Sequence, residues 1–314
     1  MSGPRIKETR LHTPPHTAPS ADSAGGAHRI YHGGSALRYP RSFLRQAISD
    51  LLGSWQAALR LFGQSIAQKY RYSALGIFWA FAPAALTAVL LTVGKRADLT
   101  ILRDGIVAPQ VYAIFGLILG QTFLEAMATQ RTLFLTHRYL LSRHQAPVEG
   151  LIIAGILENL FGLAMKVGLL ALVFLQWKTI PSVTVPLGIF GMTVILLLGT
   201  TLGLLLAPWS ALKRDLDNVM GVFPWAFMGL TPIFVPPQPD SPMAEIYRWN
   251  PFAYVFDATR FLTYGYGHQP MPGVSGSGMM TILLGALAVC IVLLPAAWIL
   301  CRVARPYIVE SYLV

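Results

Sequence analysis

The chain has 314 residues, of which 54% are hydrophobic and only 12% are charged, about half the charged share of a typical soluble domain. This composition indicates a polytopic membrane protein rather than a soluble one. The formal net charge of +10 is compatible with nucleic-acid binding, but the basic residues collect near the N-terminus and in alternate loops, without helix-turn-helix or zinc-finger spacing, so we expect no nucleic-acid partner.

Residues 1–40 are rich in Pro, Gly, Ala, Ser and His and lack an apolar period, so we expect a disordered cytoplasmic tail there. Apolar residues then recur at helical spacing with basic residues between them. This pattern predicts an amphipathic helix over residues 41–72, lying in the membrane interface and leading into the first span. A soluble core helix would show the same period, but a long apolar run follows directly. The residues expected at the interface are Trp55, Arg60, Lys69 and Arg71.

The rest of the chain predicts an all-α polytopic membrane protein with six transmembrane helices within residues 73–304 and a cytoplasmic C-terminal tail over residues 305–314. Six segments are apolar and long enough to cross a hydrocarbon core of about 30 Å. The fifth is the least regular, because Pro224 and Pro232 should kink or break it. The predicted spans are residues 74–94, 108–128, 148–175, 183–207, 217–237 and 278–301.

The distribution of Lys and Arg sets the predicted orientation. With an even number of spans, seventeen of the 24 basic residues fall on the side that carries both termini and six on the other. The positive-inside rule therefore places both termini in the cytoplasm, in a multi-pass protein of the cell inner (plasma) membrane. Glu125, Glu158 and Lys166 fall inside the predicted spans, where each needs a partner on another helix or water, and their role stays open.

Two connecting segments stand out. The cytoplasmic segment 130–143 mixes apolar and basic residues at helical spacing, which is typical both of a helix docked on a cytoplasmic partner and of a helix resting on anionic lipid. The external segment 238–276 contains an aromatic block at 249–264 that is too short and polar to span, so we expect external re-entrant helices between spans 5 and 6. Aromatic rings stack on the C–H faces of sugars, but a hydrophobic gate would use the same residues.

Motifs that carry chemistry are absent from the sequence. It contains no Gly-x-x-x-x-Gly-Lys-Ser/Thr phosphate loop, no Gly-x-Ser-x-Gly, no His-Glu-x-x-His and no Cys-x-x-Cys. We therefore predict a transport subunit rather than an enzyme, with no catalytic residue, cofactor or metal. Asp215 and Asp217 are the nearest approach to a Mg²⁺ site, as a membrane-embedded polyprenyl-phosphate transferase would need, but such a pair is more typical of a helix start.

Several short stretches, taken in order, resemble the membrane subunits of ABC exporters for polysaccharides and polyol phosphates, the O-antigen and teichoic-acid type. The resemblance covers about residues 45–310 and rests on the order and spacing of its parts on six spans. The stretches are Lys69–Trp79 before the first span, the basic segment Arg131–Arg143, Arg214-Asp215-Leu216 before the fifth span, Thr231–Pro236, and Trp249-Asn250-Pro251-Phe252.

The resemblance implies a half-transporter that forms a homodimer in the membrane and moves a lipid-linked glycan, while two copies of a separate ABC ATPase subunit bind ATP below it. An exporter of drugs or small lipids shares the six-span plan and is the alternative. The segment 131–145 would be the coupling helix, contacting the ATPase through Arg131, Phe134, His137, Arg138, Tyr139 and Arg143. The translocation path or gate would involve Trp249, Phe252, Tyr254, Phe256, Arg260 and Tyr264.

Overall fold

The computed structural model describes residues 40–71, 86, 89, 109–142, 147–178, 182–213, 215–234, 242–264 and 276–311. Regular structure within these ranges is helical throughout, which confirms the predicted all-α class. The predicted N-terminal tail (apart from Pro40) and the first predicted span (apart from Leu86 and Val89) lie outside the described residues, as does Arg143.

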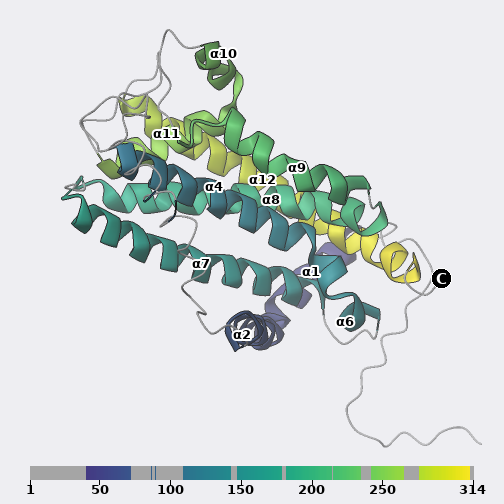
Figure 1. Cartoon of the computed structure of the whole chain (residues 1–314). Coiled ribbons are helices and arrows are strands. Elements are labelled where there is room, and N and C mark those ends of the chain that lie inside the picture. The colour runs from purple at the N-terminus through teal and green to yellow at the C-terminus, as the bar shows by residue number, and fades with distance from the viewer. Residues whose placement is uncertain are drawn as a thin grey trace, which may run out of the picture.

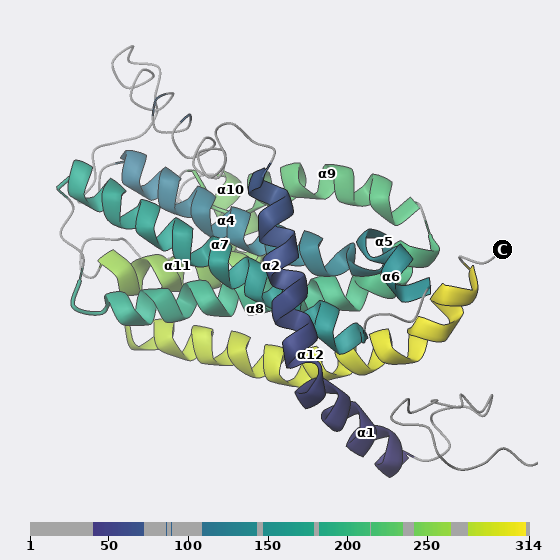
Figure 2. The same cartoon turned by 90° about the horizontal axis from the view of Figure 1, so that it is seen from below.

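Four long helices form the body of the protein and run side by side in both views (Figures 1 and 2). In the described part of the chain, these four are the helices long and apolar enough to cross a membrane. They correspond to the second, third, fourth and sixth predicted spans. The four helices are α4 (Pro109–Arg131), α7 (Val148–Gln176), α8 (Val185–Leu212) and α12 (Gly276–Ser311).

Helix α8 lies between α4 and α12 and packs against both. Two glycines explain how closely α4 approaches, because a Cβ at Gly199 or Gly203 would overlap the carbonyl oxygen of Phe123 or Met127. Helix association in lipid depends on close van der Waals packing, which small interface residues permit. The α4–α8 pair is therefore the tightly packed part of the bundle, and α4 is largely buried.

The fifth predicted span, 217–237, corresponds to a shorter helix, α9 (Asp215–Leu230), of 16 residues or about 24 Å. Pro224 lies inside α9 without ending it, and the helix stops before the turn that contains Pro232. Two helices follow, α10 (Pro242–Trp249) and α11 (Pro251–Tyr264). Helix α11 packs against α8 and α12, and its 14 residues extend only about 21 Å.

The predicted amphipathic segment 41–72 forms two helices, α1 (Pro40–Gly53) and α2 (Trp55–Arg71), with Ser54 between them. The hydroxyl of Ser54 donates a hydrogen bond to Leu51 O at 2.9 Å. Helix α2 lies across the long helices and against α7 (Figures 1 and 2). Phe62 and Phe161 meet edge to face there, with ring centroids 6.3 Å apart. Helix α2 therefore covers the N-terminal half of α7.

The short helices lie at opposite ends of the bundle. Helices α5 (Leu133–Thr136) and α6 (Arg138–Ser142) follow the C-terminus of α4, and α6 contacts α12 (Figure 2). Helices α10 and α11 lie at the other end (Figure 1), where Ser182 N donates to Thr263 O at 3.1 Å. Two apolar clusters follow this division, one centred on α4, α8 and α11 and the other joining α5 and α6 to α7, α8 and α12.

Candidate translocation path and coupling surface

Arg260 on α11 is fully buried, with 0% of its surface exposed. Its guanidinium donates hydrogen bonds to the hydroxyl of Tyr112 (2.7 Å) and to the carbonyl oxygens of Pro232 (2.6 Å) and Ile233 (2.8 Å). The guanidinium carbon also lies 3.9 Å from the centre of the Tyr112 ring. Gly116 leaves room for this arrangement, because a Cβ there would overlap the guanidinium and Ile233 O. Arg260 therefore ties α11 to α4 and to the turn after α9.

The phenylalanines and the final tyrosine predicted for the path pack into the apolar core. Phe252 and Phe256 contact Phe227 of α9, with ring centroids 5.4 Å and 6.0 Å apart. Phe252 also contacts Phe123 of α4, at 4.8 Å between centroids. Tyr264 is buried at the end of α11. Within one subunit these rings hold α11 in place, because their faces and edges meet one another.

The predicted path residues near α10 are more accessible. Trp249 is 85% exposed, and Tyr254 is partly exposed. Asn250 fixes the junction between α10 and α11: its amide nitrogen donates to Leu230 O at 2.8 Å, and its Oδ1 accepts from the Phe252 N–H at 3.0 Å. This second bond is an N-cap of α11. The contacts of Asn250 therefore fix the junction of α10 and α11, next to which the exposed aromatic side chains lie.

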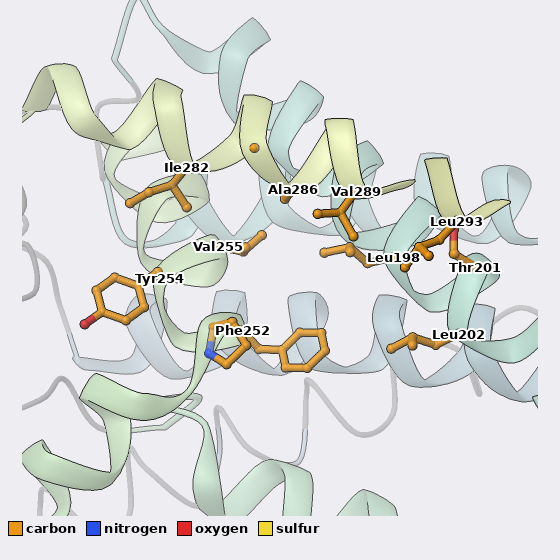
Figure 3. Close-up of a pocket in the computed structure, with 12 residues that line it drawn as sticks. Leu198, Thr201, Leu202, Phe252, Tyr254, Val255, Ile282, Ala286, Val289 and Leu293 are labelled. Carbon is orange, nitrogen blue, oxygen red and sulfur yellow. The ribbon is translucent and has the colours of Figure 1, made fainter. Parts of the chain in front are cut away.

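An apolar cavity of about 430 Å³ lies between α8, α11 and α12 (Figure 3). Leu198 and Leu202 line it from α8, Val255 from α11, and Ala286 and Val289 from α12. Its lining offers few hydrogen-bonding groups, and burying an unpaired hydroxyl against such a surface is unfavourable. The cavity suits a hydrocarbon group better than a sugar. Sequence reasoning missed it, because three helices distant in sequence build it.

The residues predicted to contact an ATPase divide between core and surface. Phe134 is fully buried in the cluster that joins α5 to α7, α8 and α12. Arg138 and Tyr139 are exposed on α6, with 59% of Tyr139 accessible. His137 lies between α5 and α6, where burial lowers its pKa from the usual 6.5 despite the opposing effect of the Glu158 carboxylate.

Arg131, another predicted coupling residue, lies at the end of α4 and contacts other helices. It forms an ion pair with Asp217 of α9 and donates to the hydroxyl of Ser210 on α8 at 2.7 Å. Ser210 in turn donates to Asp217 at 3.0 Å. One of the two acids considered for Mg²⁺ is therefore paired with a cation, while Asp215 is exposed. Among the residues with described positions, no three His, Cys, Asp or Glu side chains gather as metal ligands.

Sequence reasoning also missed a charged cluster around Arg302 of α12. One guanidinium nitrogen pairs with Asp50 of α1 at 2.7 Å, and another pairs with Glu149 of α7. Both carboxylates are largely buried, so the cluster joins three helices. Its members are more than 90 positions apart in the chain, so no local pattern shows that they meet.

The predicted interface residues lie on α2, where Trp55, Arg60 and Arg71 are exposed. Lys69 pairs with Glu158 of α7 at 2.7 Å. Glu158, one of the three charged residues inside the predicted spans, therefore has a partner on another helix.

Lys166 of α7 also has a partner on another helix, the carboxylate of Glu125 on α4 at 2.7 Å. The two side chains differ in exposure: 7% of Lys166 is accessible, against 57% of Glu125. A charge within a span is costly unless it is paired or faces water. The pair therefore places a largely buried cation beside a half-exposed carboxylate.

Comparison with known proteins gives one family. The sequence model described as "ABC-2 type transporter" matches residues 56–264, which is more than half of the chain and runs from the start of α2 to the end of α11. No curated protein matches the chain. A member of this family is the membrane subunit of an ABC transporter and works with an ABC ATPase subunit, and is not itself the ATPase. The apolar spans and the family match together show that the chain is a multi-pass membrane protein that belongs to the ABC-2 type transporter family.

Proposed function

We propose that this chain is one of two identical permease subunits of an exporter that moves a lipid-linked polysaccharide outward across the cell inner membrane. Two copies of a separate ABC ATPase subunit hydrolyse the ATP. The observation that carries the substrate class is the aromatic surface at α10, where Trp249 is 85% exposed. Its ring offers an apolar face with a polar edge, which suits stacking on a sugar ring in a wet environment.

In this proposal the chain crosses the membrane six times, with both termini in the cytoplasm. Helix α9 is the fifth span and residues 74–94 supply the first. Basic residues support the orientation, because Arg131, Lys213 and Arg302 lie at the end of the bundle that carries α5 and α6. Helices α10 and α11 then form the external re-entrant pair. Helix α2 is the interfacial helix of this proposal, and it runs across the long helices rather than along them (Figure 2).

The surface that we assign to ATPase coupling is the exposed side of α5 and α6. The opposite side of these helices is buried against α7, α8 and α12, so movement of α5 or α6 would displace three long helices together. The exposed residues are Leu135, Thr136, Arg138 and Tyr139, and the buried ones are Leu133, Phe134 and Leu141.

Reconstitution with its ATPase tests this function. Purified alone, the chain should hydrolyse no ATP, and robust hydrolysis without a partner would refute the proposal. In the complete complex, Arg138→Glu with Tyr139→Ala should abolish both export and the stimulation of ATP hydrolysis, at an unchanged unfolding temperature. Tyr307→Ala on α12 is the control, since Tyr307 is a similarly exposed tyrosine outside α5 and α6.

An exporter of drugs or small lipids is the second candidate, and the apolar cavity of Figure 3 favours it. Loss of the gene separates the two candidates. Surface glycan should disappear if the first is right, and stay intact with raised sensitivity to amphiphilic compounds if the second is right. Ala286→Trp, which fills the cavity, should impair export only in the second case.

A further inference from the structure

The accessible side of α4 carries polar groups. This span is largely buried, and among its described side chains Glu125 and Ala128 are exposed. Gln121, Leu124 and Thr129 on the same side are partly accessible, so three of these five side chains are polar. A span that turns its one accessible side to lipid would carry apolar residues there, because an unpaired polar group in hydrocarbon is costly. The pattern of α4 therefore indicates a wet surface.

Helix α7 supplies the facing wall. Glu158, Gly162 and Lys166 recur every four residues, so they lie along one side of the helix. A Cβ at Gly162 would lie 4.0 Å from the Glu125 carboxylate, an ordinary van der Waals contact, so this part of α7 lies beside that group. We call the α4–α7 seam the set of Gln121, Glu125, Ala128, Thr129, Glu158, Asn159, Gly162 and Lys166.

The seam extends from α2 towards the middle of the bundle. At its outer end, Lys69 of α2 pairs with Glu158 at 2.7 Å. Next to this pair, the hydroxyl of Thr129 donates a hydrogen bond to the side-chain oxygen Oδ1 of Asn159 at 3.2 Å. Eight residues of helix separate Glu158 from Lys166, about 12 Å. Gly162 is the midpoint of α7, so the seam reaches the centre of this span.

The different exposures of Lys166 and Glu125 determine what the inner end of the seam can bind. Lys166 is largely buried and donates to one carboxylate oxygen of Glu125 at 2.7 Å. The carboxylate itself is 57% exposed, and an ionised carboxylate has about four lone-pair sites. Most of its acceptor capacity is therefore open to a donor in the seam. The bond from Lys166 fixes the orientation of the carboxylate.

We propose that the α4–α7 seam is a binding groove for the polar head of the cargo, which enters beside α2 and donates hydroxyl hydrogen bonds to the Glu125 carboxylate. This inference rests on the proposed function and names the part of the cargo that the groove takes: a neutral, hydroxyl-rich head rather than an anionic phosphate. A phosphate would meet the exposed carboxylate of Glu125 with like charge. A hydroxyl donating to a carboxylate makes a charge-assisted bond, about twice as strong as a neutral one.

Cysteine accessibility tests whether the seam is wet. The buried cysteines are first replaced (Cys290→Ala, Cys301→Ser), and single cysteines are introduced at Ala128 in the seam and at Leu172 on α7. Both native side chains are exposed, so the pair is matched in access. In vesicles holding the complete complex, a membrane-impermeant cationic methanethiosulfonate should label Ala128→Cys at least about tenfold faster, because only a thiol in water forms the reactive thiolate.

Equal labelling of the two positions would overturn the proposal. If the same vesicles still couple ATP hydrolysis to export, the proposed function survives while the groove does not. If Ala128→Cys is labelled fast but ATP hydrolysis is not coupled to export, the groove survives and the proposed function does not.

Protection from labelling tests the chemistry of the cargo head. An alkyl maltoside, kept below the concentration that solubilises the vesicles, should slow labelling of Ala128→Cys by severalfold. An alkyl phosphate of the same chain length should not. Adding Glu125→Gln should remove most of the protection while leaving the labelling rate without maltoside unchanged. Protection by the phosphate that equals or exceeds that of the maltoside, or protection that survives Glu125→Gln, would overturn the assignment of Glu125 as the hydroxyl acceptor.

Discussion

Arg260 and Lys166 are both buried cations inside the helix bundle, but their surroundings differ. Arg260 is enclosed at the α11 end, where a tyrosine hydroxyl and two backbone carbonyls accept its hydrogen bonds. Lys166 meets a single side-chain carboxylate that is itself half-exposed. Arg260 therefore links α11 to α4 and to the turn after α9. Lys166, by contrast, lies beside a carboxylate that remains accessible at the surface of a span.

We expect this difference to separate charges that hold the fold together from charges that act in transport. A cation whose acceptors are all enclosed contributes to packing, and its loss should reduce stability before it changes transport. A cation that holds an accessible carboxylate costs stability and is better explained by what the carboxylate binds, because buried ion pairs contribute little net stability. Three predictions test the comparison, and a fourth concerns His137.

The largest effect should follow Arg260→Met. The substitution removes three hydrogen bonds of a charged donor in a buried site. Ile233 O is left without this donor, while the Tyr112 hydroxyl and Pro232 O keep only the bond between them, at 3.3 Å. Since a hydrogen bond to a charged group contributes about 1.5–3 kcal/mol and part of the loss is recovered by that remaining bond, we expect a loss of about 3–6 kcal/mol. The unfolding temperature of the purified complex and its level in the membrane measure this loss.

Arg248→Met is the control for this variant, since Arg248 is an exposed arginine on α10. It should leave the unfolding temperature unchanged. If Arg260→Met instead folded normally and failed only in export, the prediction that Arg260 belongs to the translocation path would be supported, and the comparison with Lys166 would no longer hold.

A smaller loss should follow Gly116→Ala. The new Cβ would overlap the Arg260 guanidinium and Ile233 O, so the turn after α9 must shift. Overpacking of this kind costs about 1–3 kcal/mol. Gly168→Ala on α7 is the matched control, because nothing lies within 4 Å of its Cβ position. Alanine there should be neutral or stabilising by up to about 1 kcal/mol. Equal unfolding temperatures for the two variants would show that the Arg260 cluster is not tightly packed.

In the α4–α7 seam, substitutions should reduce export more than they reduce stability. Glu125→Leu or Lys166→Met alone should cost about 1–2 kcal/mol, reduced from the value for a fully buried pair because the Glu125 end is solvated. The double variant should return to within about 1 kcal/mol of the wild type. Export should be lost in all three, since the hydroxyl acceptor or its orientation is gone. A double variant that exports normally would assign the pair to helix packing alone.

Sequence patterns predicted the features of this fold that are local. Four spans follow from apolar runs of sufficient length. Two local signals were passed over. The Asn250-Pro251 step marks the start of α11, because an N-cap and a first-turn proline are adjacent in the chain. Gly53-Ser54 is a typical helix end, and α1 stops there.

The site depended on contacts that no local pattern contains. Arg260 bonds Tyr112 across 148 positions, so nothing in the aromatic block shows that the arginine is enclosed. Helical spacing in segment 130–143 predicted a helix, but not which of its sides faces outward. Phe134 and Tyr139 were therefore both expected on the surface that contacts the ATPase, whereas Phe134 is buried and Tyr139 is exposed. The partners of Lys166 and Glu158 were left open for the same reason, since helix pairing decides them.

The smallest predicted effect concerns pH and His137. Burial lowers the pKa of His137 in the folded protein, so the unfolded chain binds a proton more readily. Stability should therefore be unaffected above the usual pKa of 6.5 and should fall as the pH drops below it, towards the lower folded value. His137→Gln removes this dependence. Between about pH 7.5 and pH 5.5 the wild-type unfolding temperature should fall further than that of the variant, and an equal fall would mean that His137 is not enclosed between α5 and α6.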